Sequence, residues 1–110
     1  MKVDYKDYSK EVLAALEKGI KNGLEAIGLT AETYAKKATP VDTGRLRNSI
    51  SHVVDGEAAY IGSNVEYAPY VELGTSRAKA HHMLQKAATE HSAEYKRLAE
   101  DAFYNAINNV

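Results

Sequence analysis

The sequence predicts an α+β fold, and two observations support it. Apolar residues recur in steps of three and four from Tyr5 to Ala38 and again from Leu84 to Asn108, which is typical of two long amphipathic helices. Between them the apolar period becomes two on either side of Asp55-Gly56, which predicts a β-hairpin. We therefore expect one domain of residues 1–110: a long N-terminal helix, a β-hairpin or small antiparallel sheet, a short helix and a long C-terminal helix.

The first helical pattern is unusually long for so small a protein. Gly19, Gly23 and Gly28 each disfavour a helix by about 1 kcal/mol relative to alanine. The apolar stripe nevertheless passes Gly28 without a change of phase, so we predict one helix, with any bend at Gly28. At ~1.5 Å per residue it is about 50 Å long, whereas a compact domain of this size has a radius of gyration near ~13 Å. One end of this helix should extend beyond the rest of the domain and be covered by another surface. The stripe consists of Tyr5, Tyr8, Val12, Leu16, Ile20, Leu24, Ile27, Ala31, Tyr34 and Ala38.

A stop and a turn follow this helix. Pro40 lacks a backbone N–H and disfavours the helical conformation of Thr39. Asp42 and Thr43 can cap backbone N–H groups, and Gly44 can adopt a positive φ. We expect Gly44 to direct the next strand away from the long helix.

The hairpin is predicted from Leu46–Val54 and Ala58–Ser63, joined at Asp55-Gly56 by a type I′ turn. Two strands alone are only marginally stable in water. We therefore expect the hairpin to pack on the helices or to extend a sheet with a neighbouring chain.

A short helix is predicted for Tyr67–Leu73, with Pro69 in its first turn and Gly74 at a positive φ just beyond its end. The polar loop Thr75–Ala80 comes next. One last helix should then continue to Asn108-Asn109. Its apolar face comprises Leu84, Ala87, Ala88, His91, Tyr95, Leu98, Ala102, Phe103 and Ala106.

Composition narrows the range of functions. The 110 residues have a formal net charge of −1, with charges of both signs mixed along the chain. This predicts no overall electrostatic field that would attract nucleic acid or a membrane surface. The absence of cysteine excludes disulfides, thiol catalysis and thiolate metal sites, and suits a reducing cytoplasm. With no signal peptide and no apolar run near the roughly 20 residues that span a bilayer, we expect a soluble protein. Small size makes self-association an expectation.

Three ordered segments, Pro40–Ile50, Ile61–Asn64 and Tyr67–Ser76, closely resemble the small tail-component family of long-tailed bacteriophages, the gene-product-ten-like proteins. The resemblance covers roughly Thr39 to the start of the last helix. It departs at His81–Leu84, where the family usually has Pro-Phe-Leu.

This resemblance implies a structural protein of the virion neck or tail, assembled in the host cytoplasm as a ring, for which it favours six copies, without catalysis or cofactor. The implied partners are head-closure or connector proteins and tail-tube proteins, with DNA only as passing cargo. The candidate assembly residues are Asp42, Thr43, Gly44, Arg45, Arg47, Tyr67, Tyr70, Glu72, Gly74, Thr75 and Ser76.

Arg45 and Arg47 would lie on one face of a strand, either solvated or paired with a carboxylate of another subunit. A second hypothesis is a nucleic-acid-binding module that uses these two arginines with Arg77 and Lys79. Lys79, His81, His82 and Lys86 extend this basic patch. Tyr60, Tyr67 and Tyr70 could stack on bases, although core and interface packing is favoured.

Two catalytic or metal-binding alternatives are weaker. Asp42-Thr43-Gly44 is the motif of dimeric aspartic proteases, but a helical pattern precedes it and Arg-Leu-Arg follows it, whereas those enzymes are all-β. His81 and His82 would diverge by about 100° on a helix. Because His91 is also distant, we expect no metal site.

Overall fold

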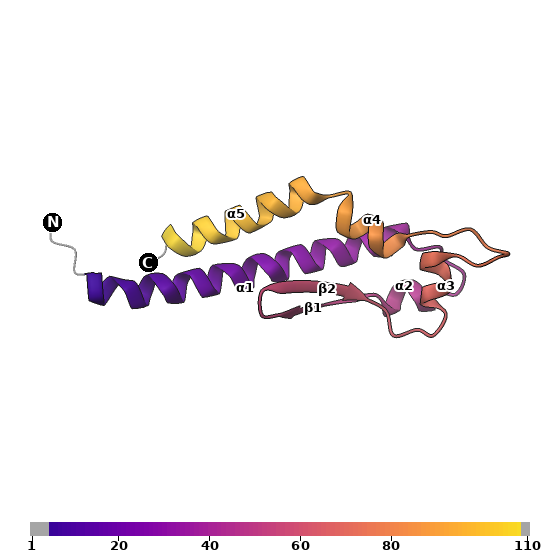
Figure 1. Ribbon diagram of the computed structural model, residues 1–110, viewed down its shortest axis with the longest axis horizontal. Coiled ribbons are helices and arrows are strands. Elements are labelled where there is room, and N and C mark those ends of the chain that lie inside the picture. The colour runs from indigo at the N-terminus through magenta and orange to yellow at the C-terminus, as the bar shows by residue number, and fades with distance from the viewer. Residues whose placement is uncertain (1–4, 109–110) are drawn as a thin grey trace.

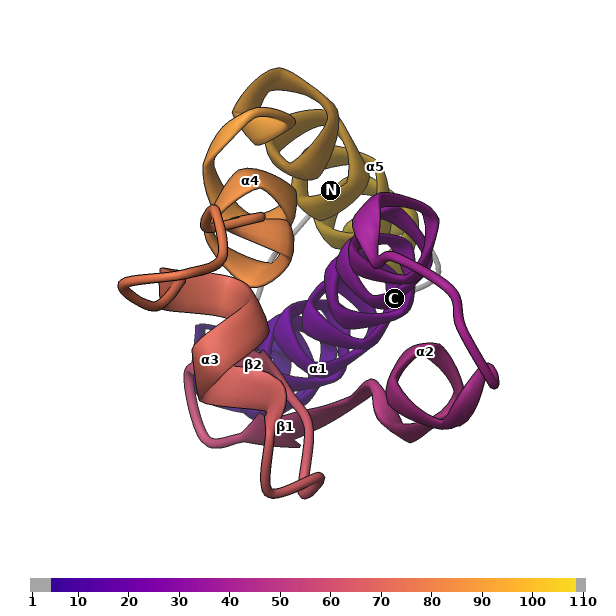
Figure 2. The same cartoon turned by 90° about the vertical axis from the view of Figure 1, so that its right-hand side faces the viewer.

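The computed structural model describes the backbone of residues 5–108, and the side chains from Lys10 to Asn108. Figure 1 shows one long rod, α1 (Tyr5–Ala38), with α5 (Ser92–Asn108) beside it on one side and the hairpin on the other. The shorter helices α2 (Arg45–Ser49), α3 (Ala68–Leu73) and α4 (Met83–Thr89) gather around the C-terminal end of α1. Figure 2, an end-on view, places α1 between α5 and the hairpin.

The molecule is elongated. Its radius of gyration is 18.4 Å and its principal extents are 69 × 23 × 21 Å, well beyond the ~13 Å radius of a compact domain of about 100 residues. The expectation that α1 outruns its domain is confirmed. No helix within residues 5–108 has the length and hydropathy needed to cross a bilayer.

Helix α1 is continuous through its glycines, as predicted, and the glycines allow close contacts. A Cβ on Gly19 would lie 3.0 Å from the Ala106 Cβ, and one on Gly23 would lie 3.5 Å from the Ala102 Cβ. These glycines therefore bring α5 against α1. Tyr5 and Tyr8 of the predicted stripe have side chains outside the described set.

The first strand begins later than predicted. Strand β1 is Ser51–Asp55, and the segment before it forms α2. Leu46 and Ile50 are four residues apart and both buried, a spacing that suits a helical turn as well as the start of a strand. The prediction of a strand from Leu46 was therefore wrong.

Strand β2 is Ala58–Gly62 and pairs antiparallel with β1, with Val53 opposite Tyr60 and Asp55 opposite Ala58. The connecting residues are thus Gly56 and Glu57, and Gly56 has φ 61° whereas Glu57 has no positive φ. This is the φ pattern of a type II′ turn, with glycine first. The predicted type I′ turn centred on Asp55-Gly56 was wrong.

The last predicted helix is two helices, α4 and α5, separated at Glu90-His91. The His91 ring stacks on the Tyr34 ring with centroids 3.5 Å apart, and the Tyr95 hydroxyl donates to the Ala87 carbonyl across the break. The break turns the chain so that α4 packs on the core while α5 runs back along α1 (Figure 1). Helix α5 ends at Asn108, and Asn109 lies outside the described residues.

The core is concentrated at the C-terminal end of α1. One cluster joins Ala35 of α1 with Ile50 and Ala87. A second cluster consists of Leu46, Val65, Ala68 and Met83. In contrast, no residue of α5 is buried, so the other end of the molecule has no core of its own.

Candidate assembly surface

Several predicted residues gather around one hollow beside the C-terminal end of α1. Its volume is about 500 Å³. The candidates Asp42, Thr43, Gly44, Arg45 and Tyr67 therefore share a surface at this end of the molecule. The lining residues are Pro40, Val41, Asp42, Thr43, Gly44, Arg45, Leu46, Tyr67 and Val71.

The turn before α2 is built as the sequence predicts, although it leads into a helix. Gly44 has φ 86°, a conformation that favours glycine. The Thr43 hydroxyl accepts a hydrogen bond from the Arg45 N–H (3.3 Å), and the Asn48 N–H donates to the Gly44 carbonyl (2.9 Å). The Asp42 side chain is exposed. Gly44 thus begins α2, rather than directing a strand as predicted.

Arg45 is neutralised within its own chain. Its guanidinium donates to both carboxylate oxygens of Glu66, at 3.2 and 3.1 Å, and lies 5.5 Å from the Tyr67 ring centroid. Hydrogen bonding to Glu66 raises the pKa of Arg45. Hydrogen bonds from the Glu66 backbone and from Arg45 lower the pKa of Glu66.

The predicted arginine face is not formed. Because α2 is a helix, Arg45 and Arg47 point about 200° apart. Arg47 is exposed and takes no part in the ion pairs within residues 10–108. Because the Arg45 guanidinium is paired with Glu66, it does not contribute to the basic patch of the nucleic-acid hypothesis.

Glu72 connects α3 to α4. Its carboxylate accepts from the backbone N–H groups of Leu84 (2.7 Å) and Gln85 (3.0 Å), and so caps α4. Glu72 was a candidate assembly residue through the family resemblance alone, and this capping role was not predicted. Twelve residues separate Glu72 from Leu84, so the cap has no local sequence signature.

Gly74 ends α3 with φ 78°, as predicted. A Cβ there would also meet the Ala80 backbone nitrogen at 2.8 Å. Thr75 then organises the loop: its hydroxyl accepts from the N–H groups of Arg77 (3.2 Å) and Ala78 (3.0 Å). Ser76 is exposed on this loop.

The tyrosines divide between core and surface. Tyr67 is half-buried against the Leu46–Met83 cluster, whereas Tyr70 on α3 is 63% exposed, and the nearby Leu73 is 71% exposed. Tyr60 lies on the outward face of the hairpin, opposite Val53. Tyr70 and Leu73 therefore give the α3 end an apolar surface, and Val53 and Tyr60 give the hairpin another.

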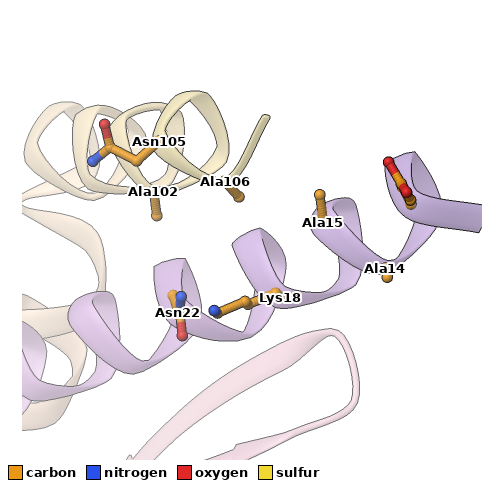
Figure 3. A pocket seen from close by; sticks show the side chains of 8 residues that line it. Ala14, Ala15, Lys18, Asn22, Ala102, Asn105 and Ala106 are labelled. Atoms are coloured by element: carbon orange, nitrogen blue, oxygen red, sulfur yellow. The ribbon is translucent and has the colours of Figure 1, made fainter. Parts of the chain in front are cut away.

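A second hollow lies between the N-terminal half of α1 and the end of α5 (Figure 3). Its volume is about 680 Å³, and small side chains of Ala14, Ala15, Ala102 and Ala106 leave it open, with polar groups at its border. Val12, Leu13, Ile20, Phe103 and Ile107 are exposed apolar residues on the same two helices. Among the described residues, this end of the rod therefore exposes apolar side chains beside polar ones.

His52 is an interaction that the sequence analysis missed. Its Nδ1 lies 3.2 Å from a Glu32 oxygen and its Nε2 lies 3.1 Å from a Glu25 oxygen, so the ring bridges two carboxylates of α1. Hydrogen bonds to Glu32 and Glu25 raise the pKa of His52. Burial alone would raise the pKa of Glu32, but hydrogen bonds from His52 and Lys36 outweigh burial and lower it. An imidazolium, which donates from both nitrogens, fits this position.

The histidines predicted not to form a metal site are dispersed. His81 is exposed, His82 begins α4 with φ 50°, and His91 stacks on Tyr34. In the part of the chain that the structure describes, no three side chains of histidine, aspartate or glutamate form a group that could hold a metal ion.

These features define a small α+β protein with a long helix pair that exposes apolar side chains and a compact motif-bearing end. Residues 4–74 match the family described as Bacteriophage HK97-gp10, putative tail-component, and the chain belongs to this family. Membership identifies a phage tail component, which supports a structural, non-enzymatic role in the virion and contacts with other phage structural proteins. Comparisons with curated proteins and with solved structures gave no significant match.

Proposed function

We propose that this protein is a ring-forming adaptor at the joint between phage head and tail, acting in neck or tail completion or as a tail terminator. Its function depends on the shape of its surfaces. A ring subunit presents different surfaces to its two neighbours, and further surfaces to the layers above and below. Head-closure or connector proteins and tail-tube proteins are the proposed partners. DNA passes through the ring as cargo.

The observation that carries this proposal is the exposed apolar surface of the α1–α5 end. Helix α5 has no buried residue, yet Phe103, Tyr104 and Ile107 expose apolar surface there. Exposed apolar patches of this kind mark interaction sites on soluble proteins. The family resemblance favours six copies in the ring.

The test is to measure the mass of the purified protein over a range of concentrations, alone and with purified neck and tail-tube proteins, by light scattering and native mass spectrometry. The expected result is a closed ring, formed without nucleic acid and promoted by a partner. A protein that remains monomeric under all these conditions contradicts the proposal. Salt-dependent DNA retention without rings would support the nucleic-acid-binding alternative instead.

A further inference from the structure

The loop Thr75–Ala80 is an ordered projection, here named the finger. Its base is closed by hydrogen bonds from the His81 N–H to the Val71 carbonyl (2.9 Å) and from the His82 N–H to the Glu72 carbonyl (3.0 Å). Within it, the Thr75 N–H donates to the Ala78 carbonyl (2.9 Å). These bonds fix the finger before any partner is bound, which lowers the entropy lost on binding.

The finger is basic. Figure 1 shows it extending beyond α3 and α4 at one end of the molecule. Arg77 and Lys79 are both exposed on it, and neither takes part in the ion pairs within residues 10–108. The finger therefore presents two cations to a partner.

A hollow of opposite charge lies where the hairpin turn meets α1, here named the turn hollow. It has a volume of about 350 Å³. Its two carboxylates, from Glu17 and Glu57, outnumber the single ammonium group of Lys21, so the hollow is acidic. Ile20, which is 46% exposed, and Val54 supply its apolar part. The lining residues are Glu17, Ile20, Lys21, Val54, Gly56 and Glu57.

The finger and the turn hollow do not meet within one chain. In Figure 1 the finger projects at one end, whereas the hairpin turn points toward the other end. Glu57 and Glu17 are exposed and lie outside the ion pairs of the described side chains. Two different, oppositely charged surfaces on one chain suit a head-to-tail contact between copies, the type of contact that closes rings.

We propose that the finger of one copy docks in the turn hollow of the next copy, with Arg77 and Lys79 facing Glu57 and Glu17. The small side chains of Ser76 and Ala78 let the finger backbone approach the hollow closely. This contact rests on the proposed ring function and identifies the surfaces that would join its subunits.

The test uses two charge-reversal variants. The finger variant, Arg77→Glu with Lys79→Glu, has an acidic finger and an acidic hollow. The hollow variant, Glu17→Lys with Glu57→Lys, has a basic finger and a basic hollow. Copies of either variant alone should repel one another, and the yield of rings should fall at least tenfold. An equimolar mixture should recover rings, because each finger then faces a hollow of opposite charge.

Native mass spectrometry with one variant isotopically labelled gives the sharpest result: the recovered rings should contain equal numbers of the two variants in alternation. Circular dichroism and melting temperature should match those of the parent, because all four side chains are exposed. A matched control, Lys37→Glu with Lys86→Glu, changes the net charge by the same amount as the finger variant and should still form rings, because both side chains are exposed and lie outside the ion pairs within residues 10–108.

The outcomes separate this contact from the ring itself. If the parent forms rings and both reversal variants also form them, the contact is wrong and the ring stands. If the control variant loses rings as well, net charge is the cause and the contact is again wrong. A parent that forms no ring with any partner contradicts the proposed function itself.

Discussion

The ring of His52 lies directly on Gly28: a Cβ at position 28 would be 2.7 Å from the His52 Cδ2. The glycine therefore makes room on α1 for a side chain of the hairpin. Glu25 and Glu32, about one helical turn away on either side, hold the two ring nitrogens. This arrangement attaches the hairpin to the long helix.

The first prediction is that alanine at position 28 displaces His52. The helix itself should gain up to about 1 kcal/mol from Gly28→Ala, but the ring must move and lose at least one carboxylate contact. We expect a lower melting temperature and a His52 pKa closer to its ordinary value, measured by NMR. Gly62→Ala is the control, because nothing lies within 4 Å of its Cβ. Equal melting temperatures for the two variants would contradict this account.

The second prediction concerns pH. The folded-state pKa of His52 is raised, so its contribution to stability is complete below its ordinary pKa of 6.5 and is lost as pH rises through the raised value. The pKa of Glu32 is lowered, so its contribution is present above the ordinary 4.5 and is lost as pH falls through the lowered value. The attachment of the hairpin should therefore be strongest between pH 4.5 and 6.5.

Urea unfolding at pH 6 and pH 8.5 measures this effect. The parent should lose free energy of unfolding at the higher pH, and His52→Gln should lose clearly less. The remaining change in His52→Gln reports the other titrating groups. Identical losses in the two proteins would show that His52 is not the responsible group.

The third prediction compares two glycines that face α5. A Cβ on Gly23 makes ordinary contact with Ala102 at 3.5 Å, so Gly23→Ala should raise the free energy of unfolding, by up to about 1 kcal/mol. A Cβ on Gly19 would be 3.0 Å from Ala106 and 3.3 Å from the backbone of Phe103. Gly19→Ala should therefore gain little or be destabilised. Urea titration of both variants measures the difference, and a more stable Gly19→Ala would reverse the expectation.

The fourth prediction is that Gly74→Val impairs assembly more than Gly44→Val. Both glycines have positive φ, where a β-branched residue is disfavoured by about 1–3 kcal/mol. Only at Gly74 would the new side chain also collide with the finger backbone, at Ala80. Helical content and melting temperature should change less than incorporation into tails, because the finger lies outside the core. Parent-like assembly of both variants would contradict this role.

The fifth prediction is that Asp42→Asn changes stability by about 1 kcal/mol at most, as expected for a minor change at a turn. No hydrolytic activity should be present to lose. Thermal unfolding and a peptidase assay of parent and variant check this directly. A peptidase activity of the parent that disappears in Asp42→Asn would restore the aspartic protease hypothesis.

The sequence predicted the features that depend on local patterns. The stripe of α1, the positive φ of Gly44 and Gly74, and the order of the elements all follow from periodicity and turn chemistry. The break between α4 and α5 was missed because Glu90-His91 contains neither glycine nor proline. Its cause is the packing of His91 on Tyr34, a contact between distant parts of the chain.

The candidate surface was predicted only where it depends on local sequence patterns. Residues that shape the backbone, such as Thr43 and Gly74, are visible as motifs. The pairing of Arg45 with Glu66 and the cap that Glu72 provides depend on which segments meet in space. His52 had no sequence signature, because its carboxylate partners lie more than a helical turn away from one another on a different element.

The contact of Gly19 with Ala106 also bears on how the chain folds as it leaves the ribosome. Helix α1 is synthesised before α5, so its glycines are uncovered until α5 emerges. Contacts so distant in sequence form slowly, because a long loop must close first. The N-terminal half of α1 therefore lacks its partner helix until α5 docks, and its apolar stripe is open to premature association until then.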